Sequence, residues 1–291
     1  MGLNPQIREL KKGAEIIIAC PGRLIDQIQR GNVDFSSLDT LVVDEADQML
    51  DMGFIPDIRR ILKHLPRQRQ TLMFSATMRP EIRRLASEML HKPVTVQIGN
   101  PAPAATVSHT HFPVSQNLKT PLLLKILSDT QFGSMLIFTR TKHRAKRLGK
   151  ILFNAGYGAT SLQGNLSQGR RQAALNGFRT GKFRILVATD IAARGIDVSR
   201  VSHVVNFDIP ATAEAYIHRI GRTGRAERKG MAFNLITGED RGIVRSIDRI
   251  LGMAVERRTF SDFDYGALPH AKKGKASRTA RPMKLIRQAA R

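Results

Sequence analysis

Residues 40–77 read TLVVDEADQMLDMGFIPDIRRILKHLPRQRQTLMFSAT, and this stretch decides the fold class. It begins with a short apolar run, Thr40–Asp44, and ends with a second, Thr71–Ser75. Between them Pro56 opens an amphipathic segment, at the position in the first helical turn that proline favours. Short apolar runs separated by helices are typical of buried parallel strands. The stretch therefore predicts a strand–helix–strand unit of a parallel α/β sheet.

The same alternation extends in both directions along the chain. Apolar runs at Ile16–Cys20 and Val94–Ile98 predict two further strands, so residues 1–98 are expected to form one parallel-sheet domain. The proline-rich range 99–115 predicts a linker, and 116–258 predicts a second, complete α/β domain. In that domain we expect strands at 135–138, 184–188, 203–207 and 232–236, and helices at 120–128, 143–154, 212–222 and 240–251.

Charge is distributed unevenly over the 291 residues. The formal net charge is +23, of which residues 1–99 carry +2, residues 100–265 carry +13 and residues 266–291 carry +8. The electrostatic field of such a positive charge attracts nucleic acid phosphates or an anionic membrane. A basic surface can also serve only to keep a protein soluble. Residues 259–291 are predicted to form a disordered basic tail that is too poor in apolar residues to lie on a membrane.

Cysteine and aromatic content narrow the class of protein. The single cysteine, Cys20, excludes an intrachain disulfide and a zinc site built on several thiolates. No apolar run approaches the length that spans a bilayer, and Met1–Gly13 does not resemble a signal peptide, so we expect a cytoplasmic protein. With no tryptophan and 5% aromatic residues, base stacking is not expected to be the main mode of binding.

Four polar motifs follow predicted strands, where ligands bind in open parallel sheets. They are Asp44-Glu45-Ala46-Asp47, Ser75-Ala76-Thr77, Ala193-Arg194-Gly195-Ile196-Asp197 and His218-Arg219-Ile220-Gly221-Arg222-Thr223-Gly224-Arg225. Paired carboxylates can hold Mg²⁺ and polarise water, and guanidinium groups can grip phosphate in a forked geometry. Taken singly, each motif also suits a cap, a turn or plain basic surface. Their order on successive strand ends favours a shared site.

This ordered set resembles the DEAD-box RNA helicases, above all bacterial ones, over about residues 2–258. Pro21-Gly22-Arg23, Phe138-Thr139-Arg140-Thr141-Lys142, and Gln163-Gly164-Asn165 with Gln168 and Arg171 also match RNA-contacting motifs of that family. The resemblance implies two tandem RecA-like parallel-sheet domains, the first of them incomplete, with ATP and Mg²⁺ as cofactors.

The resemblance also implies roles for individual residues. Asp44 would hold Mg²⁺ through water, and Glu45 would help to activate the hydrolytic water. Asp47 and His218 would link the acidic motif to the second domain, while Ser75 and Thr77 would couple hydrolysis to strand separation. Arg222 and Arg225 would be arginine fingers, and Asp197 would contact the ribose of the nucleotide. The residues implied to contact the RNA backbone are Pro21, Gly22, Arg23, Arg140, Arg171 and Thr189.

Two departures from the family pattern stand out. Cys20 occupies a position where the family usually has threonine. The larger departure is that no Gly-x-x-x-x-Gly-Lys-[Ser/Thr] sequence, whose amide groups and lysine cradle phosphates, occurs in the 291 residues. The family's glutamine motif and phosphate loop would lie upstream of Met1, so the chain is expected to begin partway through its first domain.

The function expected from the resemblance is ATP-dependent local unwinding of RNA duplexes through sequence-independent backbone contacts, by a monomer with no membrane partner. Two alternatives remain open. One is a non-catalytic RNA-binding protein that uses the second domain and the basic tail. The other is a regulator that binds an intact helicase without contacting RNA.

Overall fold

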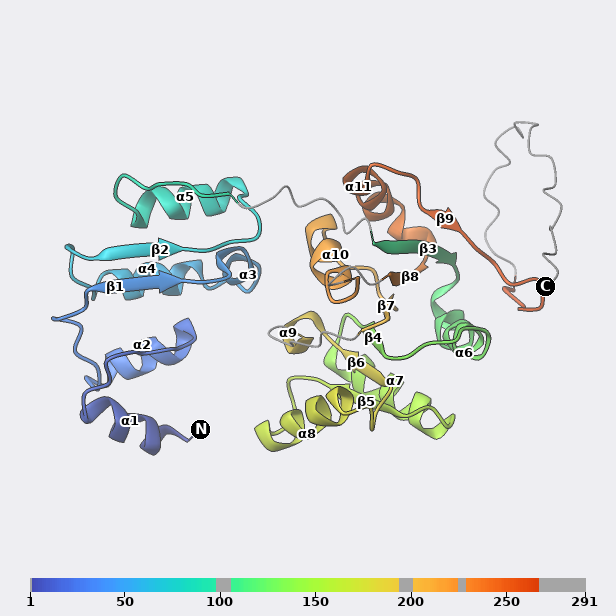
Figure 1. The fold of residues 1–291 in the computed structure, drawn as a ribbon, viewed down its shortest axis with the longest axis horizontal. Coiled ribbons are helices and arrows are strands. Elements are labelled where there is room, and N and C mark those ends of the chain that lie inside the picture. The colour runs from blue at the N-terminus through green and yellow to red at the C-terminus, as the bar shows by residue number, and fades with distance from the viewer. Residues whose placement is uncertain (1, 98–105, 194–200, 225–228, 267–291) are drawn as a thin grey trace, which may run out of the picture. The chain divides into compact units, whose positions relative to one another are not determined.

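The computed structural model describes residues 2–97, 106–193, 201–224 and 229–266. The chain divides into two compact units, which we call unit 1 (residues 1–98) and unit 2 (residues 99–291). Both units contain parallel strands with helices packed against them (Figure 1). The predicted α/β fold with parallel sheets is therefore confirmed.

Unit 1 is built around a parallel pair of strands. Strands β1 (Thr40–Val43) and β2 (Gln70–Met73) form a two-stranded sheet within the described residues. The helices of this unit are α1 (Leu3–Lys11), α2 (Pro21–Gln29), α3 (Ala46–Asp51), α4 (Ile55–Leu62) and α5 (Pro80–Met89). Ile58 of α4 and Ile82 and Leu85 of α5 are buried together with Val43 of β1. The core thus lies where the apolar periodicity of these helices predicts it.

Two strands expected in unit 1 do not form in the described residues. The segment 16–20 is not a strand, and Ile16 and Ile18 are 81% and 96% exposed. Likewise residues 94–97 form no strand, and Val94 and Val96 are exposed; residue 98 lies outside the described part. These predictions are wrong because an apolar run becomes a strand only where a neighbouring strand satisfies its backbone groups, and neither segment pairs with a described strand.

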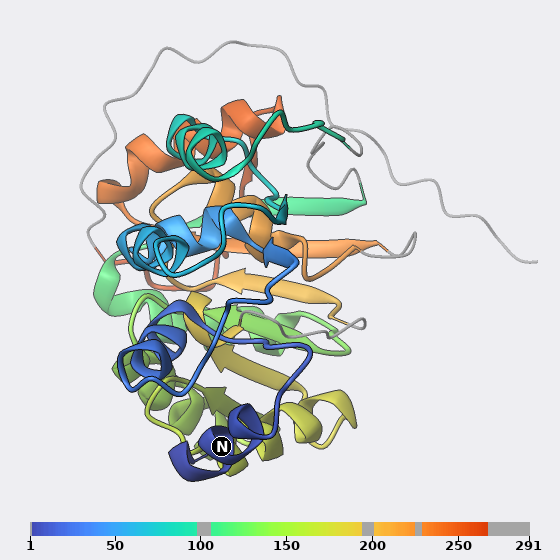
Figure 2. The same cartoon turned by 90° about the vertical axis from the view of Figure 1, so that its left-hand side faces the viewer.

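Unit 2 contains a seven-stranded parallel sheet in the order β5-β6-β4-β7-β8-β3-β9 among the described residues. Figure 2, turned by 90° from Figure 1, shows strands of this sheet side by side. The strands are β3 (Val107–Pro113), β4 (Met135–Phe138), β5 (Ala159–Leu162), β6 (Ile185–Ala188), β7 (His203–Asn206), β8 (Gly230–Ile236) and β9 (Glu256–Arg257). The helices are η1 (Gln116–Leu118), α6 (Lys119–Asp129), α7 (Lys142–Asn154), α8 (Gln168–Arg179), α9 (Asp190–Ala193), α10 (Ala213–Ile220), η2 (Gly238–Asp240) and α11 (Arg241–Leu251).

Helices cover both faces of this sheet because successive strand residues point to opposite sides. Met135 and Ile137 of β4 pack in a cluster with α6 and α7. Leu136 and Phe138 of the same strand pack with α8 and α9. Helices α10 and α11 pack on that second side, over Ala232 of β8. Buried on both faces, the central strands are continuous apolar runs.

Two boundaries of unit 2 differ from the sequence expectation. The range 99–115, expected to be a linker, contains β3, which pairs with β8 along its length. Residue 260, expected to belong to the tail that starts at residue 259, packs against unit 2 instead, because Phe260 stacks on Phe112 with ring centroids 5.8 Å apart. Residues 98–105 and 267–291, which hold the rest of the expected linker and tail, lie outside the described part.

A chain of buried polar groups crosses the second face of the unit 2 sheet. Asn206 of β7 donates to Asn234 of β8 at 2.8 Å, and Asn234 donates to the hydroxyl of Tyr216 on α10 at 3.2 Å. That hydroxyl lies 2.8 Å from Nδ1 of His109 on β3. Arg219 joins the other end by donating to Asn206 at 2.8 Å. Each of these side chains thus has a hydrogen-bond partner, which offsets the free energy of removing it from water.

Candidate functional site

The acidic motif of unit 1 follows β1 directly. Asp44 and Glu45 are both exposed, and one oxygen of Asp44 accepts the Glu45 amide at 2.8 Å. Glu45 has φ 52° and ψ 45°, in the left-handed region that a residue with a side chain seldom adopts, and it caps α3. Such strained backbone is concentrated at functional sites. The exposed carboxylates at the end of a parallel strand suit a hydrated cation.

Asp47 connects the acidic motif to Ser75 and Thr77 after β2. Its buried carboxylate accepts the backbone amide and the hydroxyl of Thr77, each at 3.0 Å. Ser75 accepts the Asp47 amide at 3.2 Å and donates to the Thr77 carbonyl at 2.7 Å. The structure therefore brings together Asp47, Ser75 and Thr77. These hydrogen bonds couple the segment after β1 to the segment after β2, so a displacement of one segment changes the contacts of the other.

Pro21, Gly22 and Arg23 form the first turn of α2. Pro21 is buried at the favoured first position, whereas Gly22 and Arg23 are exposed. The guanidinium of Arg23 lies 3.6 Å from the carboxylate of Asp26, one turn further along the helix. Cys20 precedes this turn and caps the helix without a side-chain hydrogen bond.

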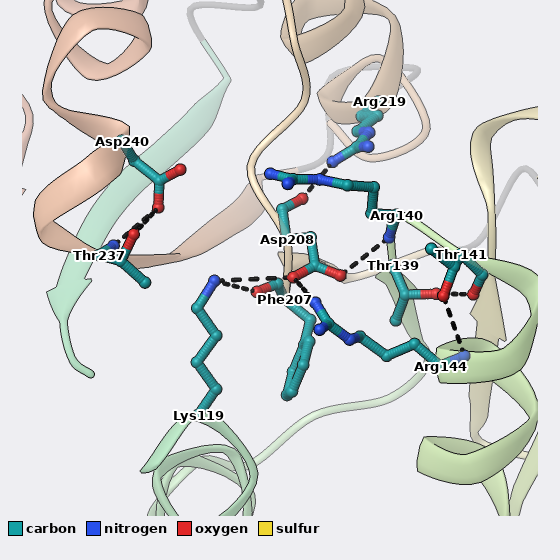
Figure 3. Close-up of polar contacts among 10 residues, drawn as sticks. All are labelled: Lys119, Thr139, Arg140, Thr141, Arg144, Phe207, Asp208, Arg219, Thr237 and Asp240. Atoms are coloured by element: carbon teal, nitrogen blue, oxygen red, sulfur yellow. Dashed lines mark hydrogen bonds and ion pairs between the residues drawn. The ribbon is translucent and has the colours of Figure 1, made fainter. Parts of the chain in front are cut away.

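In unit 2, Asp208 fixes the loop that carries Arg140. The carboxylate of Asp208 is 2% exposed and accepts the backbone amide of Arg140 at 2.9 Å and Nη1 of Arg144 at 2.5 Å. Figure 3 shows Arg144 and Lys119 both pointing at this carboxylate. The main chain between β4 and α7 is therefore held in place. This fixes the backbone of Arg140, while its side chain is exposed to solvent.

Lys119 supports the same cluster from the first residue of α6. Its Nζ donates to the Phe207 carbonyl at 2.9 Å and lies 3.7 Å from Asp208 (Figure 3). Burial lowers the pKa of Lys119, and the negative charge of Asp208 opposes that shift. Two basic side chains, those of Lys119 and Arg144, thus contact one carboxylate, so the cluster has an excess of positive charge at the carboxyl end of the sheet.

The turn after β5 is tied to α7. The side-chain oxygen of Gln163 accepts the Asn165 amide at 2.7 Å, and Nζ of Lys142 donates to Asn165 at 3.1 Å. Arg171 lies in the first turns of α8, which Ser167 caps by accepting the Arg170 amide. Strands β5, β6 and β4 are neighbours and parallel, so the loops that follow them emerge at one edge of the sheet.

Thr189 directly follows β6 at that same edge and is buried. Its carbonyl accepts the amides of Ala192 and Ala193, which begins the short helix α9. Asp190, the next residue, accepts Nε and Nη2 of Arg219 at 2.6 and 2.7 Å. This forked pair joins the Thr189 loop to α10.

His218 and Arg222 lie at the end of α10 and just beyond it, both half-buried. Gly224 follows with φ 69°, and a β-carbon there would come within 2.6 Å of Val107 and 2.8 Å of the Thr106 hydroxyl. This glycine is required by both its backbone conformation and its close approach to β3. Asp197 and Arg225, the remaining predicted site residues, lie outside the described residues. The predicted link between Asp47 and His218 stays a prediction.

Sequence reasoning missed Asp208, Asp190 and Lys119. The signal for Asp208 was present, because it is the first charged residue after the apolar run that ends at Phe207. The strand-end rule that selected Asp44 would have selected Asp208 as well. Lys119 carried no such signal, since a lysine at the start of an amphipathic helix is ordinarily exposed.

Neither a cluster of metal-binding side chains nor a membrane-spanning helix is present in the described residues. They contain no group of three or more His, Cys, Asp or Glu side chains arranged to hold a metal ion. Nor does any helix in the described part have the length and apolar character needed to cross a membrane.

Comparison with known proteins agrees with these motifs. Residues 2–85 match the DEAD/DEAH box helicase family, and residues 118–227 match the helicase conserved C-terminal domain. The chain is 43% identical over 256 residues to the DEAD-box ATP-dependent RNA helicase CshA of Geobacillus kaustophilus, covering 88% of this chain and 55% of that protein. It is 38% identical over 261 residues to the ATP-dependent RNA helicase DeaD of Buchnera aphidicola, covering 89% and 43%.

Among solved structures, Saccharomyces cerevisiae Dbp5 bound to RNA and ADP BeF3 is similar to this chain with a TM-score of 0.74. The sequence identity is 31%, over 84% of this chain and 65% of that one. Tandem parallel-sheet units with these strand-end motifs define a RecA-like helicase core. The chain belongs to the DEAD-box family of RNA helicases. It spans about half the length of the curated relatives that it matches.

Proposed function

We propose that this chain binds RNA through the sugar-phosphate backbone and acts in the ATP-dependent separation of RNA strands. The observation that carries the proposal is the common edge formed by the ends of β5, β6 and β4, which bears Gln163, Thr189 and Arg140. Three neighbouring polar loops on a basic domain offer donors to successive phosphates. Base edges need not be read, so recognition is independent of sequence.

The nucleotide-processing half of the proposal rests on the acidic motif in unit 1. Mg²⁺ usually binds through one or two carboxylates and keeps several waters, which fits the exposed Asp44 at the end of β1. The ion would polarise the terminal phosphate, and Glu45 would orient the attacking water. Ser75 and Thr77, through Asp47, would transmit the state of this centre to the neighbouring strand.

Arginines from unit 2 would complete the centre. Arg222, and Arg225 beyond the described residues, would neutralise charge on the phosphates, and Asp197 would bind the ribose. Pro21, Gly22, Arg23 and Arg171 would extend the RNA track. ATP itself is not well held by the 291 residues, because their sequence has no glycine-rich phosphate loop.

That missing loop favours a second candidate for the isolated chain, a non-catalytic RNA-binding protein. The two candidates share the RNA contacts and differ in hydrolysis. In either case we propose that the chain works as a monomer in the cytoplasm, without a membrane partner.

Fluorescence titration with a single-stranded RNA of about 25 nucleotides, at several salt concentrations, tests RNA binding. Each phosphate contact adds about 0.7 to the slope of log K against log salt. A chain that ends at residue 266 lacks eight Lys and Arg residues, so its slope is expected to fall by several units. Failure of the full chain to bind RNA at low salt would refute the proposed function.

A further inference from the structure

Helix α7 is unusually basic. Its 13 residues include Lys142, Arg144, Lys146, Arg147 and Lys150, together with His143, and contain no Asp or Glu. Arg144 is paired with Asp208, whereas Lys146, Arg147 and Lys150 form no ion pair with any described residue.

This arrangement is unfavourable for the helix itself. Lys142 and Lys146, and again Lys146 and Lys150, are separated by four residues, where like charges repel. Basic side chains in the first turn also oppose the positive end of the helix dipole. Nothing in the described part of the chain offsets these effects for the three unpaired side chains. The charge is therefore best explained by an anion that comes from outside the chain.

Hollows flank α7 on two sides. One, of about 280 Å³, lies between Lys142 and Lys146 of α7 and the Gln163–Asn165 turn. It adjoins the RNA track already proposed. The other, of about 460 Å³, lies between α7 and the start of α6, and we call it the α6–α7 groove.

The α6–α7 groove is lined mainly by hydrogen-bond donors. Arg144 and Arg147 come from α7, and Gln116, Asn117 and Thr120 come from the segment that opens α6. Arg144 is oriented by Asp208 at 2.5 Å and lies 3.2 Å from the amide of Gln116. Arg147 is exposed at the side of the groove.

The groove suits a nucleic acid backbone better than an acidic peptide. Of its three large apolar side chains, Leu148 and Phe207 are 2% and 4% exposed and Ile151 is half-buried. Little accessible apolar surface is therefore left for the anchors on which peptide interfaces depend. Both hollows are bordered by basic side chains of α7, Arg144 and Arg147 on one side and Lys142 and Lys146 on the other.

We propose that bound RNA crosses α7 and that a phosphate of the crossing strand binds in the α6–α7 groove, at Arg147 and Asn117. The inference rests on the proposed function, since it extends the RNA track of unit 2. It adds a second set of phosphate contacts, on the side of α7 that faces α6, to those at Arg140, Gln163 and Thr189.

The test compares two substitutions that remove the same charge from exposed helix positions. Arg147→Gln alters the groove, and Arg245→Gln alters α11, where Arg245 is likewise exposed and forms no ion pair with any described residue. RNA of about 25 nucleotides is titrated at several salt concentrations, as for the unaltered chain. We expect Arg147→Gln to lower the slope by about 0.7 and to weaken binding about fivefold at 0.1 M salt, with Arg245→Gln near the unaltered value.

Further variants sharpen the result. The triple variant Lys146→Gln, Arg147→Gln, Lys150→Gln is expected to lower the slope by about 2, and Arg147→Lys is expected to restore most of it, since the charge is retained. Equal effects of Arg147→Gln and Arg245→Gln would overturn the inference and leave the proposed function standing. So would a groove that binds polyglutamate in an Arg147-dependent way while RNA binding is unchanged. If the unaltered chain binds no RNA, both proposals fail.

Discussion

Arg219 and Asp190 form a forked ion pair, with both carboxylate oxygens of Asp190 accepting from one guanidinium at 2.6 and 2.7 Å. Arg219 is 3% exposed, and it also donates to the Asp208 carbonyl at 2.7 Å (Figure 3). A single side chain of α10 thus contacts both the loop after β6 and the loop after β7. The positions of Thr189 and Asp208 depend on it.

Removal of this guanidinium is expected to destabilise unit 2 strongly. Arg219→Ala leaves the buried Asn206 side-chain oxygen and the Asp208 carbonyl without this donor, at a cost of about 1–3 kcal/mol each. Asp190 adds less, because its side chain is 41% exposed. The control is Arg258→Ala, which breaks the exposed pair with Glu256 and is expected to cost less than about 1 kcal/mol. Urea unfolding followed by circular dichroism measures both. Similar losses in the two variants would contradict the assigned role of Arg219.

The contact between Asp47 and Thr77 is expected to stabilise unit 1 locally. Thr77→Val removes the hydroxyl donor from a buried carboxylate, at a cost of about 1–2 kcal/mol. Thr40→Val, at an exposed strand position, is the control and should change stability by less than about 0.5 kcal/mol. Hydrogen exchange of the β1 and β2 amides reports the difference. Unchanged protection in Thr77→Val would show that the contact contributes little.

ATP hydrolysis by residues 1–291 alone is expected to be near background, with or without RNA. Asp44 and Glu45 can polarise water, but the sequence has no loop to cradle the phosphates. Phosphate release is measured with saturating RNA, and Glu45→Gln serves as the control. RNA-stimulated release that Glu45→Gln abolishes would contradict this prediction and favour the catalytic alternative.

Unit 2 is expected to lose stability as the pH falls from about 6.5 to about 4. Burial, with a smaller contribution from the charge of His111, lowers the pKa of His109 from 6.5 to about 4. Between these values the unfolded chain binds more protons than the folded one, so the stability that is present above pH 6.5 is lost as the pH approaches 4. Burial lowers the pKa of His111 as well, which adds in the same direction.

His109→Gln isolates the part of this loss that belongs to His109. Urea unfolding at pH 7 and pH 5 is expected to show a smaller difference in this variant than in the unaltered chain. An equal difference would assign the pH dependence to other groups.

Limited proteolysis is expected to degrade unit 1 first. Large apolar side chains such as Val42 and Phe74 are exposed there, and β1 and β2 pair only with each other in the described residues. Cleavage follows local opening, so it should begin in residues 1–98. The resistant fragment should start before Val107 and extend past Phe260, because β3 and Phe260 pack in the unit 2 core. Equal resistance of both units would contradict this.

Apolar runs predicted the central strands of unit 2 correctly, but they did not reveal β3, and in unit 1 they predicted two strands that do not form in the described residues. Residues 135–138 are a buried apolar run and form β4 as expected. Strand β3 was missed because its centre carries His109, Thr110 and His111, which read as polar surface although His111 is fully buried. Conversely, Ile16 and Ile18 read as core and are exposed, because burial depends on a neighbouring strand that periodicity cannot supply.

The candidate site shows the same contrast. Motifs at strand ends identified Asp44 and Ser75 from order and spacing, and the resemblance to the helicase family added Arg140. The strand-end rule would have selected Asp208 as well, but it could not show that Asp208 contacts Arg140, which lies 68 positions earlier in the chain. The motif around either residue does not indicate a contact between residues so far apart in the sequence.

The paired amides of Asn206 and Asn234 restrict how the central strands of unit 2 can assemble. The two residues lie directly opposite each other on β7 and β8, in a region where most of the other side chains are apolar. Slippage of β7 by one residue would set Asn206 against Phe233 or Leu235. Both side-chain amides would then be buried without a hydrogen-bond partner, which would reduce the stability of the fold by about 1–3 kcal/mol for each amide. One hydrogen bond between two side chains therefore selects a single alignment from several that hydrophobic burial alone would tolerate.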